Sequence, residues 1–410
     1  MLFNRSHITK TLTYVTLYAC TVGIVLFLSD PTDHARLDFP LLRGTIIFFA
    51  TVLLTKYFFY MTLSPWYDVL REYKEFLYRT WRRARYEPKV SVIIPAWNEE
   101  VDILSTVKTI LKSTYRNTEI VIVNDGSTDM SHELISTFLS EYEKKALRAP
   151  QKQYISIVYA YQRNAGKGAA LNRGITLSSG DIIVSIDADC VVMSDTIAEF
   201  VREFRDPTVM AAVGNVKIGN TNTLLGVIQY LEFLFSFYFK KADSILNTIY
   251  IIGGAAGAFR REVFDIVGLY STENITEDIH LSVRIQAAGL KIVYAANAVV
   301  YTEGATDMTG LMKQRLRWKH GRFETFYEFH DLFFSSRPGH NRILSFIILP
   351  LAVFSDLQLF LEPFFLIFLY VYSYLVQDFS SFISGIFVVG SMFFVQIFFE
   401  ARVRVYNMNF

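Results

Sequence analysis

The chain is poor in cysteine and has no excess of charge of either sign. Its 410 residues include two cysteines, too few for a disulfide framework or a zinc site, which is compatible with a cytosolic middle domain. Forty basic and 39 acidic residues give a formal net charge of +1. Without a global basic field, the composition argues against nucleic acid as a partner.

Apolar residues, in contrast, are abundant. Hydrophobic residues make up 52% of the chain and aromatic residues 16%, while 19% are charged, and the mean hydropathy is +0.28. This composition excludes disorder and indicates insertion into a membrane. The long apolar runs lie near the two ends and most charged residues lie between them. We therefore expect a polar domain flanked by membrane segments.

Four apolar runs are each long enough to cross a hydrocarbon core of about 30 Å. They occupy residues 11–29, 43–63, 357–376 and 382–399. A shorter run at 343–354 contains proline and suits an interfacial helix. The runs divide the chain into an N-terminal transmembrane hairpin (1–63), a cytoplasmic domain (64–342), and a C-terminal interfacial helix with transmembrane helices (343–410).

Basic residues flank these runs on one side of the membrane. They include Arg5 and Lys10 before the first run, Arg71 and Lys74 after the second, and Arg402 near the C-terminus. The positive-inside rule then places both termini and the middle domain in the cytoplasm. The prediction is a multi-pass protein of the cell membrane, with the lipid bilayer as a partner.

The middle domain alternates apolar strand-like runs with helical stretches. The runs cover residues 90–96, 119–125, 154–160 and 181–189. This pattern predicts an α/β fold with a parallel sheet covered on both faces, in which ligands bind beyond the carboxyl ends of the strands. One acidic strand end is commonly a helix N-cap, but three on one sheet edge indicate a nucleotide site.

Two aspartates close the fourth run in the order Asp187-Ala188-Asp189. Alternate side chains of an extended chain share a face, so these carboxylates point the same way. Hard oxygen ligands of this kind hold Mg²⁺ or Mn²⁺, which take further ligands from substrate phosphates.

Lys167 lies in the sequence RNAGKGAALN, which lacks the spacing of a P-loop. A lysine that enters a helix among small residues can nevertheless approach a diphosphate, with help from helix N–H groups. The alternative is a basic helix start on the surface.

Glu277 and Asp278 follow Thr276, a candidate N-cap for a helix over 279–288. Acids in a first helical turn offset the helix dipole. Asp278 could equally be a general base that takes the proton of an acceptor hydroxyl. The position in the sequence supports both interpretations.

Gln314, Arg317 and Trp318 share one face of a predicted helix, at spacings of three and four. Arginine offers a charge for a leaving diphosphate, and the indole offers a flat surface for a sugar ring. The alternative is a surface arginine beside a half-buried core tryptophan.

Taken in order, SVIIPAWNEE, VNDGSTD, RNAGKGAALN, IDADC, GGAAGAFRR, TEDIHLSVRI and QRLRW resemble the processive, membrane-embedded family 2 glycosyltransferases, which include cellulose, chitin and hyaluronan synthases. The resemblance covers about residues 89–321. It implies a GT-A (Rossmann-like) fold, a Mg²⁺ or Mn²⁺ cofactor, and inverting transfer from a UDP-sugar donor to a polysaccharide or glycan acceptor. The motif sequences RNAGKGAALN and TEDIHLS are most similar to those of bacterial poly-β-1,6-N-acetylglucosamine synthases, and this resemblance implies UDP-N-acetylglucosamine as the donor.

The resemblance also implies roles for single residues. The uracil and uridine would be held by Ala96, Asn98, Glu99 and Asp125. The diphosphate would contact Lys167 and Asp187, with the metal on Asp189. Gly253 and Gly254 would border the acceptor sugar. The catalytic set would be Asp278 as base with the adjacent Glu277, and Gln314, Arg317 and Trp318 at the diphosphate and the acceptor end.

Three alternatives stay open at this level. Some relatives with these motifs glycosylate a ceramide or polyprenyl lipid, and a silent nucleotide-sugar sensor would bind without turnover. The short C-terminal membrane part also leaves room for a small membrane partner subunit, or a second copy, to complete a polysaccharide channel.

Overall fold

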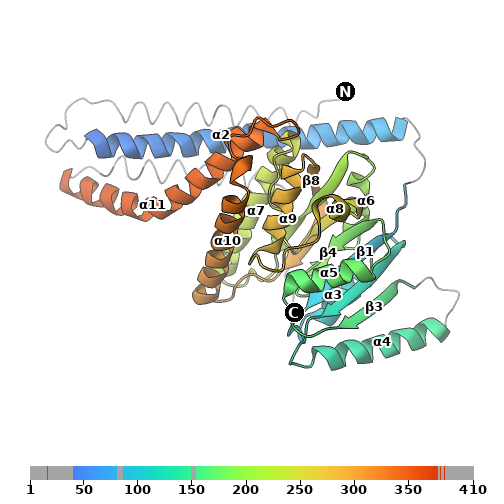
Figure 1. Cartoon of the computed structure of the whole chain (residues 1–410). Coiled ribbons are helices and arrows are strands. Elements are labelled where there is room, and N and C mark those ends of the chain that lie inside the picture. The colour runs from blue at the N-terminus through green and yellow to red at the C-terminus, as the bar shows by residue number, and fades with distance from the viewer. Residues whose placement is uncertain are drawn as a thin grey trace. The chain divides into compact units, whose positions relative to one another are not determined.

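The computed structural model describes residues 16, 40–80, 86–148, 154–376, 379 and 383 (Figure 1). The helices are α2 (Pro40–Thr80), α3 (Ile103–Leu111), α4 (Ser131–Arg148), α5 (Lys167–Leu177), α6 (Thr196–Glu203), α7 (Leu224–Leu246), α8 (Glu262–Val267), α9 (Glu277–Ala287), α10 (Met308–Glu328) and α11 (Leu349–Val376). The strands are β1 (Val90–Ala96), β2 (Thr118–Asn124), β3 (Ser156–Tyr161), β4 (Ile182–Ser185), β5 (Val191–Val192), β6 (Val209–Ile218), β7 (Gly257–Arg260) and β8 (Lys291–Thr302).

The chain divides into two compact units. One, the terminal unit, combines Met1–Arg83 with Ile347–Val405, and the other, the sheet unit, comprises Ala84–Phe346 with Tyr406–Phe410. The sheet unit contains every strand of the described residues and every predicted site residue.

Within the terminal unit, α2 packs against α11. The rings of Phe49 and Phe354 stack with centroids 4.9 Å apart, and Lys56 Nζ donates to Ser355 Oγ at 2.9 Å. Helix α11 runs without a break from Leu349, so much of the predicted interfacial segment and the predicted segment 357–376 form one helix.

No helix among the described residues is both long and apolar enough to cross a membrane. The predicted segment 43–63 falls within α2. The predicted segments 11–29 and 382–399 lie outside the described residues, apart from residues 16 and 383.

One eight-stranded sheet in the order β3-β2-β1-β4-β7-β6-β8-β5 organises the sheet unit. Strands β1 to β4 are parallel, as their apolar runs predicted, and every residue of β1, β2 and β4 is buried. Burial of alternate residues on both sides means that both faces are covered. The remaining strands make the sheet mixed: β6 and β8 pair in parallel, and β7 and β5 run antiparallel to their neighbours.

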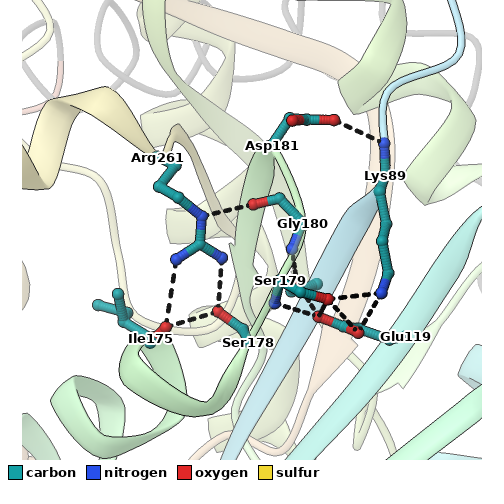
Figure 2. Close-up of polar contacts among 9 residues, drawn as sticks. Lys89, Glu119, Ile175, Ser178, Ser179, Gly180, Asp181 and Arg261 are labelled. Atoms are coloured by element: carbon teal, nitrogen blue, oxygen red, sulfur yellow. Dashed lines mark hydrogen bonds and ion pairs between the residues drawn. The ribbon is translucent and has the colours of Figure 1, made fainter.

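A polar network anchors the edge of this sheet at which β1 and β4 begin, as Figure 2 shows. Buried Glu119 accepts hydrogen bonds from Ser91 Oγ at 2.6 Å and Ser179 N–H at 2.6 Å, and pairs with Lys89 Nζ at 2.6 Å. Arg261 donates to Gly180 O at 2.7 Å and Ser178 Oγ at 2.8 Å (Figure 2). These contacts hold the last turn of α5 and the start of β4.

Candidate active site

At the opposite edge, Asp125 organises the segment that leads into α5. Its N–H donates to Ala96 O at 2.8 Å, which ties the end of β2 to β1. Its buried carboxylate accepts from Ala165 N–H at 2.9 Å, Gly166 N–H at 2.8 Å and Gln162 Nε2 at 2.7 Å. Gly166 has φ +90°, a backbone conformation that favours glycine. Asp125 thus fixes the path by which the chain reaches Lys167.

Asn98 and Glu99 lie in the loop after β1. Asn98 is left-handed (φ 57°); its N–H donates to Ser127 Oγ at 3.0 Å, and its Oδ1 accepts from Thr128 N–H at 2.8 Å. Burial, and then the neighbouring negative charges of which Asp189 is the strongest, raise the pKa of Glu99 to about 7. The loops after β1 and β2 are therefore joined, next to a region of accumulated negative charge.

Lys167 is the cation of this edge. It begins α5, and its Nζ lies 2.5 Å from Asp187 Oδ1 and 3.7 Å from Glu277 Oε1. Burial disfavours the ammonium ion, but the carboxylates of Asp187 and Glu277 outweigh burial and raise the pKa of Lys167 above its ordinary value. Lys167 is thus held charged beside Asp187.

Asp278 lies in the first turn of α9, where its carboxylate is held by backbone N–H groups. Gly254 N–H donates to Oδ2 at 2.9 Å and Ile279 N–H donates to Oδ1 at 2.8 Å. Burial raises the pKa values of Asp278 and of the adjacent Glu277. Thr276 occupies the N-cap position of α9, as predicted, although its side chain makes no capping hydrogen bond, and the helix begins at Glu277 rather than at residue 279.

Asp187 and Asp189 both lie in the segment that follows β4. Burial, and then the charge of Asp187, raise the pKa of Asp189 to about 6. Thr302 Oγ1 lies 3.4 Å from Asp189 Oδ2. Among the described residues, no group of three or more His, Cys, Asp or Glu side chains is placed to hold a metal. The only candidate metal ligands identified from the sequence in this segment are thus the carboxylates of Asp187 and Asp189, and that of Asp187 pairs with Lys167.

Gln314, Arg317 and Trp318 lie on α10, which contacts α9. Arg317 is exposed, and Gln314 and Trp318 are half-buried. The arginine over the Trp318 ring is Arg315, whose guanidinium carbon lies 4.4 Å from the ring centroid and which pairs with Glu232 of α7 at 2.5 Å. The sequence interpretation missed Arg315, although its spacing of three from Trp318 places both on one helix face.

Further along α10, the packing against α9 becomes tight. A Cβ atom on Gly321 would lie 2.2 Å from Thr276 Oγ1. Asn274 Nδ2 donates to the buried Thr325 Oγ1 at 3.3 Å, and His280 Nε2 lies 3.0 Å from Glu328 Oε2. Gln314 and Trp318 precede Gly321 by seven and three residues, so they lie on this same side of α10.

The structure thus brings Lys167, Asp187, Glu277, Asp278 and Gly254 into direct or nearly direct contact. Asp189 and Glu99 join them through electrostatic interaction. Ala96 and Asn98 lie in the adjoining β1 loop, and Gly253 precedes Gly254. In this set the ammonium group of Lys167 can bind a negatively charged group, and the carboxylate of Asp278 can accept a proton from a hydroxyl.

Two family comparisons fit this arrangement. Residues 91–268 match the family described as Glycosyl transferase family 2, and residues 182–397, about half of the chain, match Glycosyl transferase family group 2. The chain belongs to this glycosyltransferase family. It is therefore a family 2 glycosyltransferase, as the ordered motifs predicted.

Among curated relatives, the poly-β-1,6-N-acetyl-D-glucosamine synthase of Staphylococcus aureus (strain COL) is 32% identical over 237 residues. That of Staphylococcus epidermidis is 30% identical over the same length. Each match covers 57% of this chain and 55% of the relative, so the chain spans about half the length of these relatives.

A solved mannosyltransferase from Pyrobaculum calidifontis, in complex with GDP-Man and Mn²⁺, has the same overall fold. The TM-score is 0.52 with 20% identity, over 84% of this chain and 97% of the other. Together with the family match, this likeness gives the sheet unit an α/β GT-A fold.

Proposed function

We propose that the protein transfers N-acetylglucosamine from UDP-N-acetylglucosamine to the end of a growing polysaccharide, with inversion at the anomeric carbon. The observation that carries this proposal is the Asp278 carboxylate, fixed by Gly254 N–H at 2.9 Å, beside the Lys167–Asp187 pair. The identity to the two staphylococcal synthases supports the choice of donor and polymer.

In this reaction Asp278 takes the proton of the acceptor hydroxyl as its oxygen attacks C1 of the donor sugar. The bond between C1 and the diphosphate oxygen breaks on the opposite face, and its electron pair leaves with UDP. Lys167, held charged, lies where it can stabilise the negative charge that develops on the diphosphate. Arg317 on α10, the arginine of the QRLRW motif, would offer a further positive charge to the departing group.

A divalent cation fits the donor set of this edge. Asp187 and Asp189 supply hard carboxylate oxygens. Burial, and then the negative charge of Asp187, raise the pKa of Asp189, and a cation bound between the two carboxylates would offset the second of these effects. Mg²⁺ or Mn²⁺, when bound there, would supply charge neutralisation for the diphosphate. The uridine would lie against the β1 and β2 loops, with Asn98 and Glu99.

We further propose that the chain is a multi-pass protein of the cell membrane with its sheet unit in the cytoplasm, and that elongation is coupled to export of the polymer. The apolar runs and their basic flanks support this proposal. A small membrane partner subunit would complete the export path.

The test incubates detergent-solubilised full-length protein with Mn²⁺ and either UDP-N-acetylglucosamine, UDP-glucose or GDP-mannose, and follows nucleotide release and product size. We expect a high-mass product from UDP-N-acetylglucosamine that a β-1,6-specific hexosaminidase digests, and none from the Asp278→Asn variant. A single-sugar lipid product would move the protein to the lipid-glycosylating branch. Binding of a nucleotide sugar without turnover would favour a sensor.

A further inference from the structure

Lys240 is a half-buried lysine of α7 that the proposed reaction does not use. Its Nζ donates to the carbonyl oxygen of Ile251 at 2.9 Å and lies 5.4 Å from the centroid of the Phe237 ring. Burial lowers the pKa of Lys240 to about 8, although the charges of Asp243 and Asp278 favour its protonated form. Burying an ammonium group is unfavourable unless it is hydrogen-bonded, so this contact stabilises an otherwise costly position.

The carbonyl that Lys240 contacts belongs to the loop 247–254, which follows α7. The chain reverses at Asn247, which is left-handed with φ 55°. Seven helical residues from Lys240 to Asn247 rise about 10 Å, and four extended residues from Asn247 to Ile251 span up to about 13 Å. The loop can therefore run back beside α7 as far as Lys240.

On its other side the same loop is held by one face of α9. Gln286 Nε2 donates to Ile249 O at 2.8 Å, and Ile252 N–H donates to Ser282 Oγ at 2.9 Å. The third contact is that of Gly254 N–H with Asp278. These α9 residues are spaced by four, about 6 Å per step, and contact the loop in reverse order. The loop thus lies antiparallel to α9, fixed at three levels.

Lys240 supplies the matching contact from the α7 side. Ile249 and Ile252 direct buried side chains into the core, and Ile251 between them offers its carbonyl to Lys240. That contact ties the middle of the loop to α7. Gly254 lies three residues further on, so a shift of the loop there moves the N–H that orients Asp278.

We propose that Lys240 is a positioning residue for the acceptor: by holding the Ile251 carbonyl, it fixes the loop 247–254 against Asp278 and so sets where the acceptor hydroxyl meets the base. This inference rests on the proposed function. The donor side also packs against Gly254, but it has contacts of its own that do not involve the loop: Asp125, which follows β2, holds the segment before α5, and Lys167 pairs with Asp187, which follows β4. Loss of Lys240 therefore affects acceptor use more than donor use.

The kinetic test compares Lys240→Met and Lys240→Arg with the parent protein, using UDP-N-acetylglucosamine, Mn²⁺ and a β-1,6-linked N-acetylglucosamine pentamer. For Lys240→Met we expect the KM for the pentamer to rise about tenfold, the effect of one lost charged hydrogen bond, while the KM for UDP-N-acetylglucosamine stays within about twofold. Lys240→Arg keeps a cationic donor and restores most of the acceptor affinity. Lys291→Met is the matched control, because Lys291 is half-buried and paired with Asp206 at 3.0 Å.

Hydrogen exchange provides a second readout that needs no substrate. In Lys240→Met the amides of residues 249–254 should exchange faster, while those of α5 keep their protection. An unchanged KM for the pentamer, an equal rise of the KM values for pentamer and donor, or unchanged exchange over 249–254 would overturn the inference. If the parent protein releases no UDP, the proposed function fails, and the exchange measurement still decides the role of Lys240. If Lys240→Met does not fold, Lys240→Arg and Ser282→Ala are measured in its place.

Discussion

Gly254 and Lys167 approach one another so closely that a methyl group on Gly254 would lie 2.7 Å from Lys167 Nζ. The same methyl would lie 3.6 Å from Asp187 Oδ1. Because the obstructed atom is the far end of a flexible side chain, the protein can accept the methyl by moving the ammonium group. The cost then falls on the ion pair rather than on the fold.

We therefore expect Gly254→Ala to lower kcat/KM for the donor by about tenfold or more, since a charged hydrogen bond is worth about 1.5–3 kcal/mol. Its melting temperature should stay close to that of the parent protein. Gly253→Ala is the comparison, because a Cβ atom there meets nothing within 4 Å. Steady-state kinetics with both variants measure this, and equal losses would assign the effect to loop flexibility instead.

Asp278→Asn should remove the proposed base with little change of shape, although its single amide oxygen can replace only one of the two carboxylate oxygens that accept Gly254 N–H and Ile279 N–H. An amide cannot take the acceptor proton, so we expect kcat to fall by roughly 10²–10⁴-fold. Asn retains an oxygen that accepts a backbone N–H, and calorimetric binding of UDP should therefore be preserved. In the parent protein, the raised pKa of Asp278 moves the acidic limb of kcat/KM above the ordinary carboxyl range, with activity lost as pH falls. Near-normal turnover by Asp278→Asn would remove Asp278 from this role.

Asp125→Ala should destabilise the segment 162–166, which leads into α5. The change removes the carboxylate that accepts the N–H groups of Ala165 and Gly166, and a hydrogen bond to a charged group is worth about 1.5–3 kcal/mol. We expect a lower melting temperature and a higher donor KM, measured by thermal unfolding and UDP release. Asp195→Ala is the control, because Asp195 is exposed and makes no side-chain cap hydrogen bond at the start of α6. A similar loss in both variants would contradict this account.

The lowered pKa of the Glu119 carboxyl makes the stability of the fold depend on pH. Burial opposes ionisation of its carboxyl, but hydrogen bonds led by that of Lys89 outweigh burial and lower the pKa from 4.5 to about 2. Because the folded-state pKa is depressed, the stabilisation is present above about 4.5 and is lost as pH falls towards 2. Glu119→Gln should flatten the melting temperature over this window, as measured by thermal unfolding in a pH series. A slope as steep as that of the parent protein would place the acid sensitivity elsewhere.

Much of the sheet edge that carries the candidate active site could be predicted from the sequence. The continuous apolar run at 90–96 coincides with β1, and a lysine that follows Gly166 does begin α5. These features are local: burial on both faces imposes an apolar run, and a helix start needs a suitable N-cap. The direction of β7 is not local. Its four residues, Gly257–Arg260, are too few to show an alternation of apolar and polar side chains. Only the pairing of β7 with β4 and β6 reveals that it runs antiparallel.

Partners contributed by distant elements were also beyond the sequence. Arg315 was available at the right spacing from Trp318, but its selection over Arg317 depends on Glu232 of α7. Asp125 was predicted to touch uridine, and in the structure its carboxylate accepts three hydrogen bonds from residues 162–166. Lys240 belongs to no motif, because its partner is a backbone carbonyl that any residue could supply.

The close approach of Gly321 to Thr276 has a mechanical consequence. The Thr276 side chain fills the space that a side chain at position 321 would need, and the contacts Asn274–Thr325 and His280–Glu328 also join α10 to α9 and the segment before it. Any side chain at position 321 would therefore force α10 away from Thr276, the N-cap residue of α9. Since Asp278 lies two residues after Thr276, such a change on α10 would reach the proposed base without touching it.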